Sequence, residues 1–356
     1  MSARDDVLSR ERLIASRLER WFSISQRPLP WRKEYRPYHI WVSEVMLQQT
    51  RMEVVLQYFE KFVNRFPNIT ALANATLDDV LTAWSGLGYY RRARMLHQGA
   101  QMVRERFHSR LPRDLATLTS IPGIGRYTAG AIASVSFDLP HPIVDGNVAR
   151  LLARIDGLYD AFGTSALSTA EWSLAERLVA SSESPRAFNQ AMMEVGALIC
   201  RPSAPECPAC PVRDLCVAYA TNAVDLLPVK APRAGVRTMQ IPLYLIRDAS
   251  GAILMRREVE GSLMSGMFHL PHGSRELLDA ASLQVIASTS SLGVFRHTVT
   301  NRRIEFLVVS AGLATDSVSE TAEEYVWIDP RHVSDIPHPS YVRKALEMAG
   351  LLKKRS

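Results

Sequence analysis

Apolar side chains recur every three to four residues through most of the first 220 positions, the period of an α-helix with one buried face. The stretches with this period are 40–62, 71–84, 88–107, 114–137 and 170–200. Prolines and paired glycines separate them, as at Gly86–Gly88 and Pro140–Pro142. The pattern predicts an almost entirely helical domain over residues 1–220.

The pattern changes beyond a segment, 221–236, that contains two prolines and no hydrophobic period, and we interpret it as a linker. Two short apolar runs flank Ala249–Gly251 and predict a β-hairpin, with strands at 241–248 and 252–258. Further elements are expected as strands at 302–312 and 323–330 and as helices at 277–288 and 341–352. Residues 237–356 are therefore expected to form an α+β domain.

Composition places the chain among folded globular proteins, because 47% of its 356 residues are hydrophobic and 22% are charged. A net charge of +6 permits a nucleic-acid partner without establishing one. Residues 1–21 are charged from the fourth position and predict an amphipathic helix rather than a signal peptide. No apolar run approaches the ~20 residues of a membrane span. The sequence predicts a cytoplasmic protein, by default monomeric, without a membrane partner.

The segment IPGIGRYTAG, at 121–130, combines a proline that fixes φ with glycines that tolerate φ > 0. It lies between two predicted helices and so predicts a helix-hairpin-helix over 114–137. Backbone amides at such a turn form an anion site, and a DNA phosphate is one such anion. The expected phosphate contacts are Gly123, Gly125 and Arg126.

Asp145 follows Gly125 by twenty residues, in the segment VDGNVAR at 144–150. A carboxylate just beyond a hairpin that holds a DNA phosphate predicts that Asp145 takes part in a reaction at the deoxyribose. The alternative is an ordinary helical turn followed by an aspartate that caps the next helix.

All four cysteines lie between residues 200 and 216, with the spacing C-x6-C-x2-C-x5-C. The set is Cys200, Cys207, Cys210 and Cys216. Four thiolates hold either zinc or a [4Fe–4S] cluster. Structural zinc usually pairs two short knuckles, so one knuckle with two longer arms favours the cluster. Zinc, or four unconnected thiols, remain the alternatives.

Together these segments resemble the adenine DNA glycosylases, which excise adenine mispaired with 8-oxoguanine or guanine. This family is a branch of the helix-hairpin-helix glycosylase superfamily that includes endonuclease III. The motifs that carry the resemblance are PLPWR, WVSEVMLQQT, GLGYYRRAR, IPGIGRYTAG, VDGNVAR, NQAMMEVGALIC and the cysteine set. The resemblance implies a helical glycosylase domain with an iron–sulfur loop, followed by a Nudix-like domain that recognises 8-oxoguanine.

By position in these motifs, the resemblance assigns Glu44 as the acid that protonates N7 of adenine. Asp145 would stabilise the oxocarbenium ion or form a transient covalent sugar adduct, and Asn147 would position the site beside the sugar. Tyr127 occupies the place of the lysine that lyase relatives use. Without an amine there, the resemblance implies a monofunctional glycosylase.

The resemblance also assigns the residues that would hold DNA in a base-flipped state. Arg32 and Glu194 match members of the adenine pocket. Gln49 and Tyr89 match residues that wedge into the duplex, with Leu87 nearby. The arginines that follow Tyr90 could reach phosphates or form an exposed basic helix face.

In the C-terminal domain, the family reads the lesion with a Phe-Ser-His loop, and the corresponding residues are Phe295, Arg296 and His297. Arginine in place of serine adds length and charge and removes a small hydroxyl. The Nudix catalytic box needs the pattern R-E-x-x-E-E, and segment 266–283 has Arg275 and Glu276 but lacks the acidic pair, so pyrophosphate hydrolysis is disfavoured.

The implied partner is double-stranded DNA with adenine opposite 8-oxoguanine or guanine, and in a bacterium the protein would lie on the nucleoid. The alternatives are a related glycosylase of other base specificity, a bifunctional lyase, or a non-catalytic DNA-damage binding protein. Tyr127 disfavours the lyase, and retention of Glu44 and Asp145 disfavours the binding protein.

Overall fold

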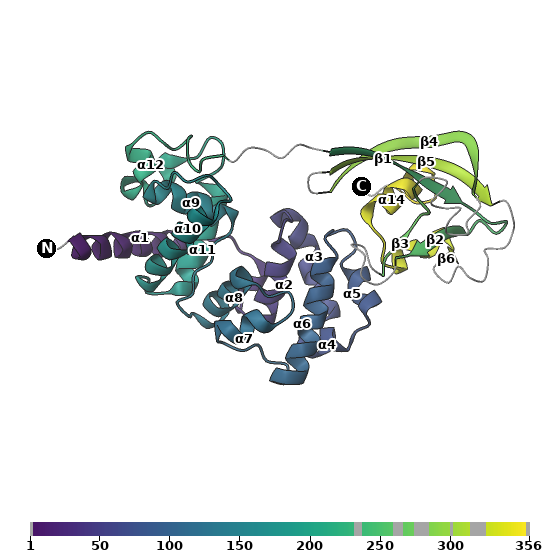
Figure 1. Cartoon of the computed structure of the whole chain (residues 1–356). Coiled ribbons are helices and arrows are strands. Elements are labelled where there is room, and N and C mark those ends of the chain that lie inside the picture. The colour runs from purple at the N-terminus through teal and green to yellow at the C-terminus, as the bar shows by residue number, and fades with distance from the viewer. Residues whose placement is uncertain are drawn as a thin grey trace. The chain divides into compact units, whose positions relative to one another are not determined.

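The computed structural model describes residues 3–230, 237–258, 266–273, 285–299, 302–313 and 325–353, which form two compact units (Figure 1). The first unit comprises Met1–Asn74 and Met95–Pro232, and the second comprises Ala75–Arg94 and Arg233–Ser356. The second unit therefore takes a segment from the middle of the helical region as well as the C-terminal part of the chain.

The first unit is helical, as predicted. Its longer helices are α1 (Ala3–Ser25), α2 (Pro37–Leu47), α3 (Met52–Arg65), α4 (Ile69–Asn74), α6 (Arg91–Phe107, whose first turn belongs to the second unit), α7 (Leu115–Ser120), α8 (Arg126–Ala131), α9 (Gly146–Asp156), α10 (Ser165–Ala180), α11 (Pro185–Leu198) and α12 (Val217–Ala220). The predicted helical stretch 40–62 is two helices, because Gln49 breaks it with a φ of +55°.

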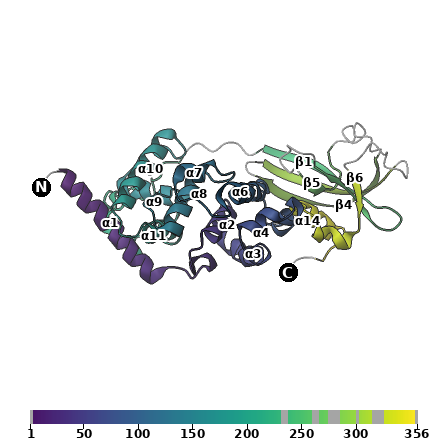
Figure 2. The ribbon, with the colours of Figure 1, turned by 90° about the horizontal axis from the view of Figure 1, so that it is seen from below.

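A core of buried aliphatic and aromatic side chains joins α1, α9, α10 and α11 (Figure 2). Leu18 of α1, Leu152 of α9, Leu178 of α10 and Phe188 of α11 are each at most 1% exposed. Burial of each such side chain stabilises the fold by roughly 1.5–3 kcal/mol. The packing fixes the N-terminal end of α9, which Asp145 caps, relative to α11.

The helix-hairpin-helix is present: α7 and α8 flank the turn at 121–125, and α8 continues into a π-helical turn, η2 (Ile132–Ser136). Ile121 and Ile124 anchor the turn, with exposures of 2% and 3%. Gly123 has a φ of +81°, and a Cβ there would lie 2.9 Å from Met95 Cβ. Gly125 does not use the tolerance for φ > 0, since its φ is −88° and it is the extended N-cap residue of α8.

The C-terminal part of the second unit contains two small sheets. One has the order β1-β5-β4, with β1 (Arg237–Ile246) parallel to β5 (Arg302–Leu313) and β4 (Val285–Val299) antiparallel to β5. The other has the order β3-β2-β6, from β3 (Phe268–His269), β2 (Ile253–Arg257) and β6 (Tyr325–Ile328), all antiparallel. Helix α14 (Ser340–Met348) packs Val342 and Leu346 against the first sheet (Figure 1). This confirms the α+β class.

Two element predictions in this region were wrong. β1 and β2 do not form a hairpin: they belong to different sheets, and an isolated bridge joins Arg247, just after β1, to Ile253 of β2. The C-terminal end of the predicted helix 277–288 is part of β4, because Val285 and the residues after it pair with β5. Positions 277–284, and with them most of the Nudix-box comparison, lie outside the described residues.

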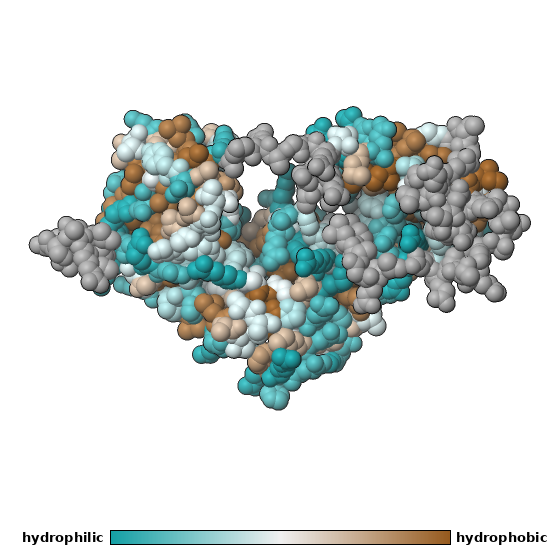
Figure 3. Space-filling view, in the orientation of Figure 1, coloured by the Kyte–Doolittle hydropathy of each residue, from teal (hydrophilic) through white to brown (hydrophobic). Residues whose placement is uncertain are grey.

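The surface of the first unit is mixed, mostly hydrophilic or neutral, with hydrophobic patches over the part that carries α12 (Figure 3). Val217, Tyr219 and Leu226 are among the exposed apolar residues there. Within the described residues, no helix has both the length and the hydropathy needed to cross a bilayer.

Candidate active site

A cleft of about 910 Å³ opens in the first unit, and its walls come from five separate segments of the chain. Those segments are the turn around Trp31, helix α2 with the loop that follows it and the start of α3, helix α8 with η2, residues 144–147, and helix α11. The cleft brings together all four predicted catalytic residues and the predicted base-pocket residues Arg32 and Glu194, as well as Gln49.

Glu44 lies on α2 among apolar neighbours, and its side chain is almost buried, with 6% of the residue exposed. The Tyr127 hydroxyl donates a hydrogen bond of 2.7 Å to Glu44 Oε2. Burial raises the pKa of Glu44 to about 7, the Tyr127 hydrogen bond and the Arg32 charge oppose the rise, and the negative charge of Asp145 adds to it. Glu44 is thus a carboxylic acid that still carries its proton close to neutral pH.

Asp145 caps helix α9 and is held by three hydrogen bonds. Its Oδ1 accepts from the backbone amides of Asn147 and Val148, at 2.9 and 2.7 Å, and its Oδ2 accepts from Asn147 Nδ2 at 3.2 Å. The capping role, weighed above as an alternative, therefore coexists with a place in the cleft.

Asn147 is oriented by an arginine that the sequence did not single out. Arg150 donates to Asn147 Oδ1 at 2.9 Å, to the Gly196 carbonyl at 2.7 Å and to the Cys200 carbonyl at 2.8 Å. These bonds join the start of α9 to the end of α11. No pattern marks Arg150 in the sequence, because two of its partners, Gly196 and Cys200, lie more than forty residues away.

At the other side of the cleft, Glu194 is fully buried on α11 and receives two arginines. Arg32 Nη1 donates to Glu194 Oε1 at 2.6 Å, and Arg27 Nε donates to Oε2 at 2.8 Å. Arg32 Nε also donates to Gln190 Oε1 at 2.8 Å. Arg27 and Gln190 were not predicted. Both belong to the cleft, and together they build a flat polar wall of donors and acceptors around a carboxylate.

The predicted phosphate contacts are on the outside of the hairpin. Gly125 and Arg126 are exposed and Gly123 is half-buried. The Arg126 guanidinium stacks 3.8 Å above the Trp172 ring and forms a 2.8 Å ion pair with Glu176. DNA phosphate would have to compete with Glu176 for this side chain.

The remaining predicted contacts belong to the second unit. Tyr89 is 44% exposed and has a φ of +48°, whereas Leu87 is only 5% exposed and so lies under the loop surface. Arg92 is directed into this loop, where it donates to the carbonyls of Leu87 and Gly88 at 3.2 Å.

Phe295, Arg296 and His297 lie within strand β4, paired with Phe306, Glu305 and Ile304, and not in a loop as expected. Successive side chains on a strand face opposite sides. Phe295 and His297 accordingly contact the Phe306 ring. Arg296 is exposed and forms a 2.8 Å ion pair with Glu305.

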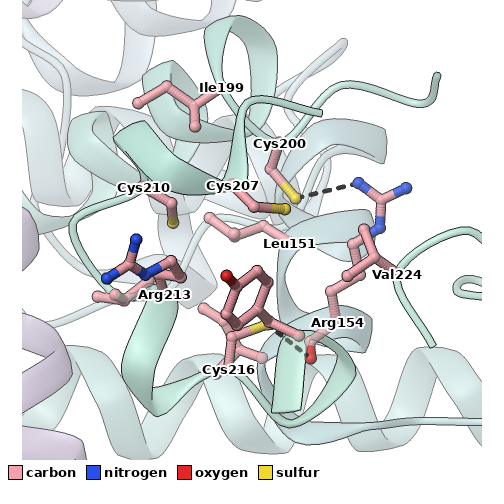
Figure 4. A pocket seen from close by; sticks show the side chains of 12 residues that line it. Leu151, Arg154, Ile199, Cys200, Cys207, Cys210, Arg213, Cys216 and Val224 are labelled. Atoms are coloured by element: carbon pink, nitrogen blue, oxygen red, sulfur yellow. Dashed lines mark hydrogen bonds between the residues drawn. The ribbon is translucent and has the colours of Figure 1, made fainter. Parts of the chain in front are cut away.

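The four cysteines line one cavity together with apolar side chains from α9 and the 212–224 segment (Figure 4). Arg154 Nη1 donates to Cys200 Sγ at 3.3 Å, and the Cys216 thiol donates to the Arg154 carbonyl at 3.2 Å. Burial raises the pKa of the Cys210 thiol to about 12. Throughout the described part of the chain, no group of three or more His, Cys, Asp or Glu side chains is arranged to hold a metal ion.

Two family models match the chain. The model of the HhH-GPD superfamily of base excision DNA repair proteins matches residues 42–174, and that of the NUDIX domain matches residues 243–348. The adenine DNA glycosylase of Buchnera aphidicola subsp. Schizaphis graminum is 31% identical over 335 residues, which cover 92% of this chain and 96% of that protein. The human adenine DNA glycosylase is 44% identical over 205 residues, which cover 55% of this chain and 37% of the human protein.

Solved structures match the helical part of the fold. A thermostable thymine-DNA glycosylase is 27% identical with a TM-score of 0.53, covering 60% of this chain and 98% of that one. A trapped endonuclease III–DNA covalent intermediate is 21% identical with a TM-score of 0.51, covering 62% and 99%. The endonuclease III likeness is one of fold.

Proposed function

Because the chain belongs to the adenine DNA glycosylases, within the HhH-GPD superfamily of base excision DNA repair proteins, we propose that it removes adenine mispaired with 8-oxoguanine or guanine in duplex DNA. The reaction is hydrolysis of the N-glycosidic bond, without strand cleavage. The observation that carries the proposal is that the buried Glu44, whose pKa is raised to about 7 by burial, shares one cleft with Asp145.

The two carboxyl groups divide the work by their surroundings. Glu44 keeps its proton because burial disfavours its charge, and it would deliver that proton to N7 so that adenine leaves as a neutral base. Asp145 is held by two backbone amides beside the same cleft, and its carboxylate would stabilise the positive charge that develops at C1′. The same division of roles between two carboxyl groups serves glycosidases.

The buried Glu194 with Arg27 and Arg32 supports recognition of a flipped-out base. Adenine presents donors and acceptors along one edge, and a wall of carboxylate and guanidinium groups can match both. Flipping costs a few kcal/mol and is least costly at a mispair. Gln49 and Tyr89 would fill the space that adenine leaves in the duplex, and Gly123, Gly125 and Arg126 would hold the backbone.

We also propose that Cys200, Cys207, Cys210 and Cys216 hold a [4Fe–4S] cluster with a structural role. The four thiols face one apolar cavity, and Arg154 already donates to Cys200 Sγ, so a guanidinium is in place to offset thiolate charge. Iron and zinc analysis of the purified protein tests this: iron with sulfide supports the cluster, and zinc alone overturns it. Cys207→Ser should lower the iron content.

The test of the reaction is single-turnover release of adenine from duplexes that pair it with 8-oxoguanine, guanine or cytosine. Wild type should release adenine opposite the first two, and Glu44→Gln should release about 10²- to 10⁴-fold more slowly. Tight binding without release by wild type would instead support a non-catalytic damage-binding protein. Selective release of thymine from a mismatch would support the related base specificity.

A further inference from the structure

The loop that carries Tyr89 is fixed at one point to the C-terminal part of the chain within the second unit. The Tyr90 hydroxyl donates a 2.9 Å hydrogen bond to the carbonyl of His338, 248 residues away in sequence. The same hydroxyl accepts from the backbone amide of Gly86 at 3.3 Å. Tyr90 and His338 are 3% and 4% exposed, so this contact is shielded from water.

The segment that receives Tyr90 is itself held in place. His338 Nδ1 lies 2.9 Å from the Ile336 carbonyl, and the Phe268 amide of β3 donates to the Pro337 carbonyl at 2.9 Å. His338 lies two residues before α14, whose apolar face packs on the β1-β5-β4 sheet. Tyr90 is therefore bonded to a rigid part of the C-terminal region.

A second contact joins the same two parts of the unit. Arg257 of β2 donates through Nη2 to both carboxylate oxygens of Asp78, at 2.6 and 2.9 Å. Asp78 lies in the first turn of helix α5 (Leu77–Ala83), which leads into the Tyr89 loop. The pair is about half-exposed, so it contributes less than the buried Tyr90 contact.

Between these two contacts the loop has little freedom. Trp84 Nε1 donates to the Gly88 carbonyl at 3.2 Å, and the Arg92 guanidinium lies 5.5 Å from the centres of both the Trp84 and Tyr89 rings. Tyr89 alone projects, with 44% of its surface exposed. The orientation of the Tyr89 ring therefore depends on the contacts that hold the loop against the C-terminal region.

We propose that Tyr90 is a positioning residue. Its hydrogen bond to His338 makes the Tyr89 loop and the C-terminal region one rigid body, which recognises the strand opposite adenine. The inference rests on the proposed wedge role of Tyr89. In such a rigid arrangement, contacts with the base opposite adenine would affect the position of Tyr89, the residue proposed to fill the space that the flipped-out adenine leaves. Loss of the bond should therefore reduce the advantage of 8-oxoguanine over guanine, as well as the rate.

Tyr90→Phe removes only the hydroxyl. Adenine release opposite 8-oxoguanine under single turnover should fall about three- to tenfold, the value of a lost buried hydrogen bond. Release opposite guanine should fall less. The pH dependence of the rate should not move, because Glu44 is untouched. Tyr159→Phe, which removes an exposed hydroxyl in the first unit, is the matched control and should behave as wild type.

A charge exchange decides the question even if Tyr90→Phe folds poorly. Asp78→Arg and Arg257→Asp should each reduce the preference for 8-oxoguanine about twofold, and the double variant should recover it. Unchanged preference in Tyr90→Phe and in both single charge variants, with wild type active, overturns the positioning role and leaves the proposed function intact. Absence of release by wild type overturns the proposed function instead.

Discussion

The Tyr127 hydroxyl donates to the Glu44 carboxylate over 2.7 Å, so the residue expected at the position of the lyase lysine contacts the carboxyl group proposed as the acid. This hydrogen bond lowers the pKa of Glu44, against a larger rise caused by burial. Tyr127 therefore bears on two expected properties of the enzyme: the absence of a Schiff-base lyase reaction, and the pH dependence of adenine release.

The pH profile of adenine release should depend on this contact. The wild-type rate should decline by about tenfold per pH unit above the Glu44 pKa of about 7, as the acid loses its proton. Tyr127→Phe removes the bond that lowers the pKa, so the decline should begin at higher pH. Single-turnover rates from pH 5 to 9 measure both. A decline that begins at lower pH in Tyr127→Phe would contradict the assignment.

The same carboxyl group should make stability depend on pH. Its folded pKa, about 7, exceeds the ordinary value of 4.5, so the folded state holds its proton more tightly. Stability from this group is complete below pH 4.5 and is lost as pH rises to about 7. Glu44→Gln should thus stabilise the protein by up to about 3 kcal/mol at pH 8 and little at pH 4.5. Urea unfolding at both pH values tests this, and equal effects would refute it.

Asp145→Asn should separate the capping role from the chemical one. Asparagine caps helices about as well as aspartate, so the free energy of unfolding should change by less than about 0.5 kcal/mol. Loss of the negative charge should slow adenine release about 10²- to 10³-fold. Thermal unfolding and single-turnover kinetics on one preparation give both values. A destabilised variant with near-normal kinetics would show that Asp145 only caps α9.

The hairpin offers a matched pair of glycines. Gly123→Ala places a Cβ 2.9 Å from Met95 Cβ at a φ of +81°, and should cost about 1–3 kcal/mol and weaken DNA binding. Gly125→Ala meets open space at a φ of −88° and should leave stability nearly unchanged. Denaturant titrations compare the free energies of unfolding of the two variants. Equal losses of stability would mean that the positive φ and close packing at Gly123 do not limit substitution.

Borohydride treatment should leave the wild-type enzyme unlinked to its DNA. No amine occupies position 127, so no Schiff base to C1′ forms readily there. Gel analysis of the treated complex tests this, with endonuclease III as a positive control for trapping. A covalent adduct in wild type would mean that another amine acts as a nucleophile and that the enzyme is not monofunctional.

Local signals predicted the helical region well, because proline, glycine and a 3.6-residue period act within a few positions. Glu44 and Asp145 were singled out in this way or through the family motifs, and both line the cleft. The failures involve distant partners. Whether β1 pairs with β2 or with β5 depends on packing across sixty residues, and Arg27 and Arg150 acquire their roles from α11 and the cysteine loop.

The insertion of residues 75–94 into the second unit has a consequence for how the protein can be divided. A protease cut between Pro232 and Arg233, where the chain passes from the first unit to the second, would not yield two self-sufficient fragments. The fragment ending near residue 230 would retain α5 and the Tyr89 loop but lose His338 and Arg257. Tyr90, which is 3% exposed in the intact chain, would become more exposed to solvent. The fragment should therefore aggregate more readily and unfold less cooperatively than the intact chain.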